Sequence, residues 1–300
     1  MYKIIDVNGS KICYEPFPSM WTAEYYNYCI DLLIKTLASC PNKINIIFGN
    51  IEYLFKNDNK TIKIDIQTEH TLVKPGGRSV DELIFGSVDL LDEDGKYLIR
   101  IVERNYFSRL DVIIDYSMAN IFNASTNSIC NEYSKRVTYI APMLYDLNNF
   151  NNQNRQYTIT IGNSSDRRTV LNSKINGLVN IQNVLDKEKL KDIYKQTKIM
   201  INIHQTDHHH TLEELRILPA LCNGVIIVSE DVPLKDVIPY SDSIIWGSYA
   251  DIPDIVKDVE DNYDYCHERI FTTKLTSILQ QLRCDNLKKM KSLIDTLAKH

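Results

Sequence analysis

Four histidines stand at the end of an apolar run at residues 198–204 and in the polar loop after it, where their rings could hold an anionic group. They are His204, His208, His209 and His210. Thr211 and Glu214 form the pattern of a capping box, which predicts a helix that begins at Leu212 and ends at Asn223-Gly224. The loop then lies at a helix N-terminus, where free N–H groups favour a negative charge. This segment therefore predicts the binding of a phosphate.

A second anion site is indicated by the segment ITIGNSSDRR at residues 159–168. A strand ends there in Gly162-Asn163, and Arg167 and Arg168 begin the next helix. Glycine lets a backbone approach a ligand closely, and arginine pairs well with phosphate oxygens. The alternative is a plain turn with solvated arginines. If both loops follow neighbouring strands of one sheet, together they would clamp a diphosphate.

The histidine cluster could instead ligate a metal ion such as zinc, because His204 and His208 are four residues apart. Three consecutive histidines on a loop cannot easily point at one ion, and Asp207 is the one further ligand in the loop. We therefore predict an anion site and no metal site.

The second half of the chain alternates strands with helices. Apolar runs stand at residues 157–161, 178–182, 198–204, 225–229 and 243–246, with helical segments from 166, at 186–197 and at 212–221. Continuous apolar strands in such alternation predict a parallel sheet that helices cover on both faces, which is a Rossmann-like domain. From residue 254 onward the apolar residues recur at helical spacing, so the chain should end in helices.

The first half of the chain reads as a separate α/β domain. Its predicted strands, after an opening run near Ile4, are residues 43–48, 61–66, 97–102, 112–114 and 137–140. A helix is predicted at residues 22–39, before Pro41. The polar stretch LNNFNNQNRQ at 147–156 is typical of a surface linker. We predict an N-terminal Rossmann-like domain at 1–147, a linker at 148–156, a C-terminal Rossmann-like domain at 157–260 and terminal helices at 261–300.

The composition excludes several classes of protein. Of 300 residues, 44% are hydrophobic, and 34 basic residues against 39 acidic ones give a net charge of −5, which makes nucleic acid an unlikely partner. The seven cysteines are scattered without a CxxC pair, so neither a disulfide framework nor a zinc knuckle is expected. The sequence has no signal-peptide pattern and no membrane-length apolar run. We expect a cytoplasmic protein without a membrane span.

The segment from residue 157 to about 260 resembles the nucleotide-sugar half of the GT-B glycosyltransferases, in particular the branch called glycosyl transferases group 1. The resemblance is carried by Asn202-x-His204, Glu214-x-Arg216, the stretch PALCNG at 219–224 and the strand VIIVSE. It implies a GT-B fold, with two Rossmann-like domains facing across a cleft and the terminal helices packing back on the first. It also implies a nucleotide-diphosphate sugar as donor, a glycan or other hydroxyl acceptor, and no cofactor or metal. The donor site that it implies contains Gly162, Asn163, Arg167, Arg168, His204, Gln205, Thr206, His208, His209, His210, Thr211 and Leu212.

The chain departs from the family's pattern at two acids. Many members of the family have Glu-x7-Glu, whose second glutamate grips the nucleotide ribose, but Thr211 and Pro219 stand at these positions here. Glu214 or Glu230 could replace the missing acid. Arg216 could pair with the pyrophosphate or with a neighbouring carboxylate.

An acid and a histidine stand together in the first half, at Glu69-His70, where the apolar run at 61–66 ends. In an inverting transferase, either could be the general base that deprotonates the acceptor hydroxyl. The alternative is a solvated strand end. The turn PGGR at 75–78 would be an acceptor-side loop or a lid.

Three other functions remain open on the sequence alone. One is a GT-B-fold sugar-nucleotide epimerase or hydrolase, which would form product without an acceptor. Another is a non-catalytic module that binds a nucleotide sugar or a glycan, which the missing acids favour. The third is a viral enzyme that glycosylates a protein, a glycan or DNA bases and would work in the host cytoplasm.

Overall fold

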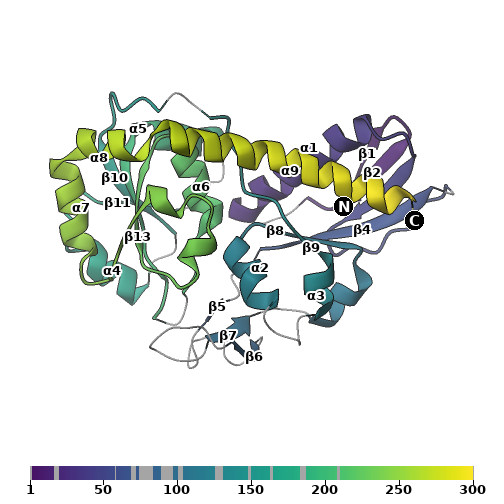
Figure 1. The fold of residues 1–300 in the computed structure, drawn as a ribbon, viewed down its shortest axis with the longest axis horizontal. Coiled ribbons are helices and arrows are strands. Elements are labelled where there is room, and N and C mark those ends of the chain that lie inside the picture. The colour runs from purple at the N-terminus through teal and green to yellow at the C-terminus, as the bar shows by residue number, and fades with distance from the viewer. Residues whose placement is uncertain are drawn as a thin grey trace.

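The computed structural model contains two large β-sheets flanked by helices and one small antiparallel sheet (Figure 1). It describes residues 2–16, 20–57, 59–68, 72–73, 84–88, 97–100, 104–125, 131–147, 150–162, 165–182, 187–207 and 210–299. Within these residues, no helix is both long and apolar enough to cross a membrane.

Six strands form the N-terminal sheet, in the order β1-β2-β3-β4-β8-β9. They are β1 (Lys3–Val7), β2 (Ser10–Tyr14), β3 (Ile44–Phe48), β4 (Lys60–Gln67), β8 (Val112–Asp115) and β9 (Val137–Tyr139). β1 and β2 form an antiparallel hairpin, and the other neighbours pair in parallel. Every residue of β3 and of β8 is buried, as expected for parallel strands covered on both faces.

Helix α1 (Met20–Ala38) packs against this sheet and matches the helix predicted at 22–39. Tyr25, Cys29 and Leu33 recur every four residues and are fully buried, so they form its core-facing stripe. The Tyr25 hydroxyl donates to the carbonyl of Ile140 at 2.7 Å, which fixes the helix to the chain just after β9. The N-terminal unit also contains the 3-10 helix η1 (Arg104–Arg109), α2 (Met118–Ser125) and α3 (Asn131–Arg136).

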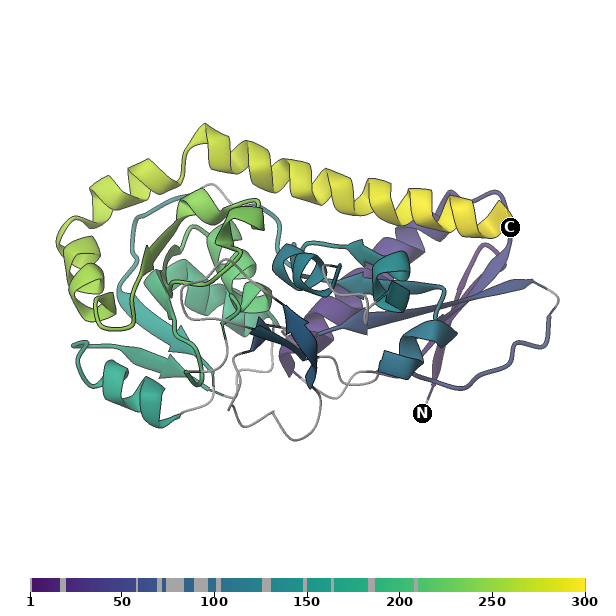
Figure 2. The same ribbon diagram turned by 60° about the horizontal axis from the view of Figure 1, so that its bottom comes forward.

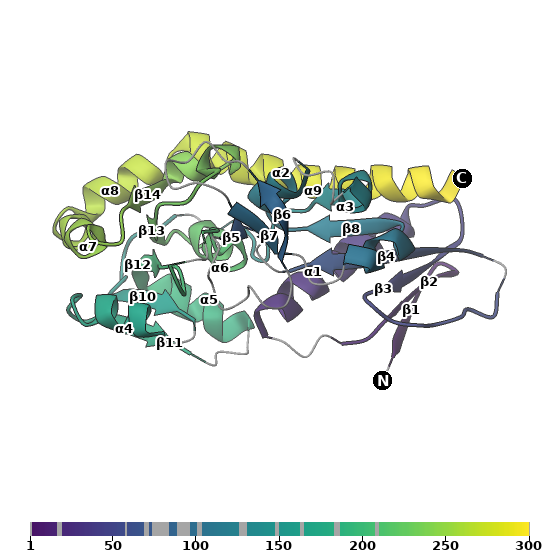
Figure 3. The same ribbon diagram turned by 90° about the horizontal axis from the view of Figure 1, so that it is seen from below.

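A small three-stranded sheet was not foreseen. Its strands are β5 (Leu72–Val73), β6 (Ile84–Val88) and β7 (Tyr97–Arg100), which pair antiparallel in the order β5-β7-β6. The strand predicted at 97–102 therefore exists as β7, but its place among the strands of the N-terminal sheet was wrong. Figure 3 shows this small sheet between the two larger units.

Five parallel strands form the C-terminal sheet, in the order β11-β10-β12-β13-β14. They are β10 (Tyr157–Ile161), β11 (Val179–Ile181), β12 (Thr197–Asn202), β13 (Ile226–Glu230) and β14 (Ile244–Gly247). Between them lie α4 (Asp166–Asn172), α5 (Lys187–Gln196), α6 (Glu214–Cys222), and the short η3 (Lys235–Val237) and η4 (Ser241–Ser243). This alternation confirms the predicted Rossmann-like half.

The chain ends in α7 (Ile252–Asp261), α8 (Tyr263–Ile270) and the long α9 (Thr273–Lys299). Figures 1 and 2 show α9 running from the C-terminal unit back over the N-terminal one. It packs against α1, and Lys60 of β4 donates to the carbonyl of Leu297 near its end at 2.7 Å. Two parallel α/β units with a terminal helix that packs back on the first are the GT-B arrangement, as predicted.

One asparagine attaches α9 to the N-terminal unit. Asn286 is 1% exposed, and its Oδ1 accepts from the N–H of Ala141 at 2.9 Å. Its Nδ2 donates to the carbonyl of Ala141 at 2.8 Å and to the hydroxyl of Tyr28 at 2.9 Å. The side chain thus satisfies both backbone polar groups of Ala141, two residues after β9, and so attaches α9 to the N-terminal unit.

We expect Asn286→Ala to lower the free energy of unfolding by about 1–3 kcal/mol, because it leaves the buried N–H and C=O of Ala141 unpaired. Urea unfolding of Gln281→Ala is the control, since Gln281 is exposed on the same helix and its side chain donates to Asp285 at 2.7 Å. Equal midpoints for the two variants would contradict this role for Asn286.

The segment between the two sheets is anchored by a buried charge. Arg155 is 7% exposed, although the sequence predicted a surface linker at 148–156 with almost nothing to bury. Its guanidinium donates to the carbonyls of Asn151, Tyr194, Thr197 and Asn223. The segment therefore joins the sheets but also packs into the C-terminal unit, and the predicted domain boundaries stay a prediction.

Candidate functional site

The loop after β10 brings two guanidinium groups onto one glycine. Gly162 follows the last residue of β10 and has a φ of +138°. A Cβ at this position would lie 2.8 Å from Nη1 of Arg168 and 2.9 Å from Nη1 of Arg216. Two cations therefore converge on a backbone without a side chain, where both could hold one anionic group.

Arg168 reaches this glycine from the first turn of α4. The helix begins after Ser165, whose hydroxyl accepts from the N–H of Arg168 at 3.2 Å. The guanidinium is buried and donates from Nε and Nη2 to the carbonyl of Ile203, at 3.0 and 2.8 Å. Burial lowers the pKa of Arg168 from its ordinary value, yet an arginine stays charged in proteins. Arg168 thus links the loop after β10 to the loop after β12.

Arg216 reaches the same glycine from α6. Its Nη1 donates to the carbonyl of Ile161 at 3.2 Å and lies 3.8 Å from Oε2 of Glu213. Of the two partners considered for Arg216, the neighbouring carboxylate is therefore present. A long, partly exposed pair of this kind is weak, so an incoming phosphate could compete for the guanidinium.

Arg167 lies in the same region but is held by carboxylates. It makes a two-pronged ion pair with Glu230 at the end of β13, and its Nε bonds to Asp207. Its guanidinium also stacks 3.9 Å from the ring centre of Tyr249, whose hydroxyl donates to the carbonyl of Arg167 at 2.7 Å. Through these contacts Arg167 acts as a brace, joining the start of α4 to the loop after β12, the end of β13 and the loop after β14.

We expect Glu230→Gln to lower the free energy of unfolding by about 1–3 kcal/mol, because the nearly buried Arg167 loses its charged partner. Asp207→Asn is the matched control, since the Asp207 side chain is 80% exposed and its pair should contribute under about 1 kcal/mol. Thermal unfolding of both variants checks this, and a larger loss for Asp207→Asn would contradict the brace.

The histidine loop contributes one buried and one partly buried ring among its described residues. The N–H of His204 donates to Oε2 of Glu230 at 3.1 Å, and its ring lies 5.2 Å from that of His210. Nε2 of His210 lies 2.9 Å from the carbonyl of Asp207, so this ring closes the loop on itself. In the described part of the chain, no cluster of three His, Cys, Asp or Glu could hold a metal ion.

The predicted capping box was wrong. Helix α6 begins at Glu214, not at Leu212, and its N-cap is Glu213, which makes no side-chain capping bond. Thr211 and Leu212 are buried and precede the helix, and the carbonyl of Leu212 accepts from the N–H of Glu214 at 2.8 Å. The helix ends at Cys222 as expected, and Gly224 follows it with a φ of +79°.

The structure places Glu214, which the sequence predicted as a donor-site residue, in the interior of the protein. Its side chain is fully buried, and Tyr240 donates to its Oε2 at 2.7 Å. The structure brings six of the predicted residues close together: Gly162, Arg167, Arg168, His204, Arg216 and Glu230. Gln205, Thr206 and His210 belong to the adjoining loop after β12. The predicted Glu69, His70, Asn163, His208 and His209 lie outside the described residues.

Sequence reasoning missed Tyr249, the aromatic platform under Arg167. It follows β14 by two residues, so it stands at the same edge of the sheet as the loops after β10 and β12. An aromatic residue just beyond the carboxyl end of a parallel strand is the signal that could have found it.

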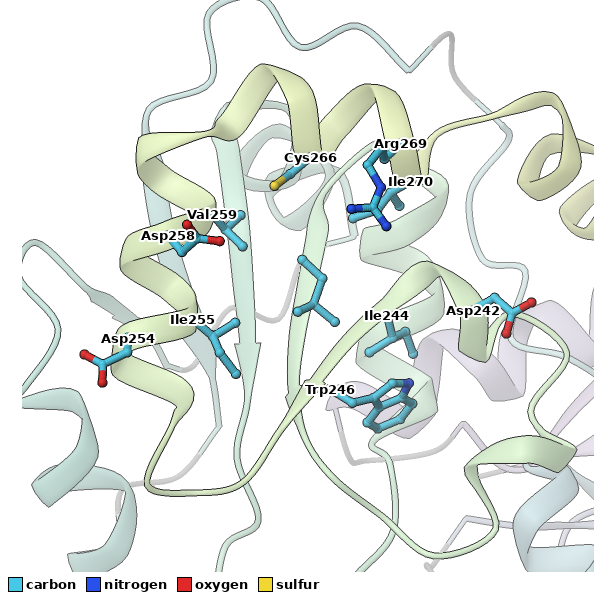
Figure 4. Close-up of a pocket in the computed structure, with 11 residues that line it drawn as sticks. Asp242, Ile244, Trp246, Asp254, Ile255, Asp258, Val259, Cys266, Arg269 and Ile270 are labelled. Atoms are coloured by element: carbon cyan, nitrogen blue, oxygen red, sulfur yellow. The ribbon is translucent and has the colours of Figure 1, made fainter.

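A separate hollow of about 600 Å³ lies beside β14, between α7 and α8 (Figure 4). Its apolar wall includes Ile244, Trp246 and Ile255, and three aspartates and one arginine line it (Asp242, Asp254, Asp258 and Arg269). This excess of negative charge disfavours a phosphate, so the loop at Gly162 is the better anion site.

Comparisons with known proteins give remote similarities. No protein-family model matches the chain. The uncharacterized protein R358 of Acanthamoeba polyphaga mimivirus is 28% identical over 187 residues, which are 60% of this chain and 64% of R358. A crystal structure of TarM covers 98% of this chain and 63% of its own, at 12% identity and a TM-score of 0.47.

A second solved structure is an alpha,alpha-trehalose-phosphate synthase (UDP-forming) from Burkholderia vietnamiensis. It is 7% identical, covers 93% of this chain and 80% of its own, and has a TM-score of 0.42. The chain thus spans less than two thirds of R358 and of TarM.

Proposed function

We propose that the protein is a glycosyltransferase that transfers a sugar from a nucleotide-diphosphate donor to a hydroxyl acceptor. The observation that carries the proposal is the approach of Arg168 and Arg216 to Gly162 at the end of β10. Ligands of open α/β sheets bind at this edge, and two guanidinium groups beside a bare backbone suit a diphosphate. The donor diphosphate would lie against Gly162, between these two arginines.

The chemistry follows from where charge develops. As the sugar's anomeric carbon leaves the diphosphate, negative charge grows on the bridging oxygen, and the two cations stabilise it there. Because the protein supplies this positive charge, we propose that transfer needs no metal ion and no cofactor. Arg167 would act indirectly, since Glu230 and Asp207 already pair with it and Tyr249 stacks on it.

A non-catalytic nucleotide-sugar module is the second candidate. Thr211 and the buried Pro219 occupy the positions where similar transferases carry two glutamates. Glu214 is buried against Tyr240, and Glu230 is paired with Arg167, so neither carboxylate is placed to take over without rearrangement. This arrangement favours binding without turnover.

A thermal-shift screen with nucleoside diphosphates and their sugar conjugates tests both candidates. A ligand at about 100 times its Kd should add about 2.7 kcal/mol of stability. Under the proposal, one nucleotide family shifts the melting temperature with or without EDTA, and incubation with its sugar conjugate and an acceptor panel releases the diphosphate. Binding without release would favour the module, and no shift with any nucleotide would overturn both.

A further inference from the structure

Two fully buried carboxylic acids, one in each unit, interact electrostatically. Asp115 is the last residue of β8 in the N-terminal sheet, and Glu214 is the first residue of α6 in the C-terminal unit. Both side chains are 0% exposed. Ionised carboxylates are almost never fully buried without a cationic partner, so this pair calls for a physical explanation.

Asp115 is surrounded by hydrogen-bond donors of its own unit. The hydroxyl of Tyr133 donates to Oδ2 at 2.5 Å, and the N–H of Ser117 donates to Oδ1 at 2.8 Å. Nδ2 of Asn120 donates to Oδ1 at 3.3 Å. These donors are all neutral, so they solvate the carboxyl group without balancing a charge.

Glu214 has fewer partners. Tyr240 donates to Oε2 at 2.7 Å, and Ser117 is a second side-chain hydrogen-bond partner of the carboxyl group, but neither carries a positive charge. An ionised carboxylate in a dry interior with neutral partners is strongly unfavourable, and a proton on the group removes most of that cost.

The titratable groups around the pair are acids and phenols. Tyr25 of α1 and Tyr139 of β9 interact electrostatically with Asp115, and Tyr139 and Tyr240 do so with Glu214. In the described part of the chain, no lysine, arginine or histidine forms a hydrogen bond or ion pair with either carboxyl group. Burial raises the pKa of Asp115 to about 7, and burial and the charge of Asp115 raise that of Glu214 to about 7.

We propose that Asp115 and Glu214 together retain a proton near neutral pH, and that this proton holds the first turn of α6 against the end of β8. Loss of the proton would place two uncompensated charges in the contact between the units and push them apart. Both residues are positioning residues, because α6 carries Arg216 and directly follows the loop at 204–213.

The sign of the pH dependence follows from the raised pKa values. A group with a folded pKa above its unfolded value gives stability that is complete below the unfolded pKa, about 4, and disappears as the pH rises through about 7. The melting temperature of the native protein should therefore fall from about pH 4 to about pH 7 and level off above that. Glu214→Gln, which resembles the protonated acid, should remove much of this fall.

The experiment is a set of melting curves from pH 4 to 8.5 for the native chain, Glu214→Gln and Glu268→Gln, an exposed control on α8. At pH 8.5 we expect Glu214→Gln to melt at least about 5 °C above the native chain, while the two converge near pH 4. Glu268→Gln should follow the native chain throughout. A Glu214→Gln curve parallel to or below the native one would overturn the proposal.

If Glu214→Gln folds poorly, a second variant, Asp115→Asn, and infrared spectroscopy of the native protein test the same proposal. At pH 6 the native protein should show the carbonyl band of a buried protonated carboxyl group, which should disappear by pH 8.5 and change in Asp115→Asn. Absence of that band at pH 6 would overturn the proposal. Neither the melting curves nor the infrared band depends on what binds at Gly162, so this test is independent of the proposed transferase activity.

Discussion

Gly162→Ala is expected to weaken nucleoside diphosphate binding by about 10- to 100-fold, the equivalent of one lost arginine–phosphate pair. The new methyl group would lie 2.8 Å from Nη1 of Arg168 and 2.9 Å from Nη1 of Arg216, so both guanidinium groups must move. It would also occupy the space that the phosphates need. Isothermal titration calorimetry with the nucleotide that stabilises the native chain measures the change in Kd.

Gly177→Ala is the control for replacing a glycine that has a positive φ. Gly177 also has a positive φ, +71°, but an added Cβ meets nothing within 4 Å. We expect Gly177→Ala to lower stability slightly and to keep the native Kd. If the two variants lost affinity equally, the placement of the diphosphate at Gly162 would be wrong.

Arg155→Met is expected to lower the free energy of unfolding by about 3–5 kcal/mol, the largest stability effect that the structure predicts. The guanidinium donates to the carbonyls of Tyr194, Thr197 and Asn223, so it joins the junction of α5 and β12 to the end of α6. Methionine fills the space but donates nothing, so these carbonyls lose their shared donor. Chemical denaturation followed by circular dichroism measures the loss.

Arg269→Met is the matched substitution, because Arg269 is exposed on α8 and its guanidinium lies 5.6 Å from the ring centre of Tyr265. Its unfolding midpoint should stay close to the native value. Arg155→Met with a midpoint equal to that of Arg269→Met would mean that the segment between the sheets is not anchored by this side chain.

The C-terminal half could be predicted well because its signals are local. The strands β10, β12 and β13 are rich in the β-branched residues isoleucine, threonine and valine, and they alternate with helices, which indicates a parallel sheet. Glycine and arginine at the end of β10 then stand at the binding edge by topology alone. The convergence on Gly162 follows from that order of elements.

The hairpin of β1 and β2 was missed although its signal was present. Asn8 and Gly9 have φ values of +54° and +86°, and Asn-Gly between two apolar runs is a strong hairpin signal. The small β5-β7-β6 sheet carries a weaker signal, because short strands in a long insertion do not show which sheet they join.

Long-range pairing explains the remaining differences. The pairs Arg167–Glu230 and Asp115–Tyr133 join residues 63 and 18 positions apart, and Asp115 interacts electrostatically with Glu214 of the other unit. A local pattern made Glu214 a capping residue, but the fold places its side chain against Tyr240 instead. Which polar groups meet is decided by packing, which sequence spacing does not encode.

The most direct test of the account is a crystal structure of the protein with the nucleoside diphosphate that stabilises it most. The account predicts both phosphates beside Gly162, with oxygens within hydrogen-bond distance of the guanidinium groups of Arg168 and Arg216. A nucleotide bound elsewhere, with these two arginines still on the carbonyls of Ile203 and Ile161, would contradict it.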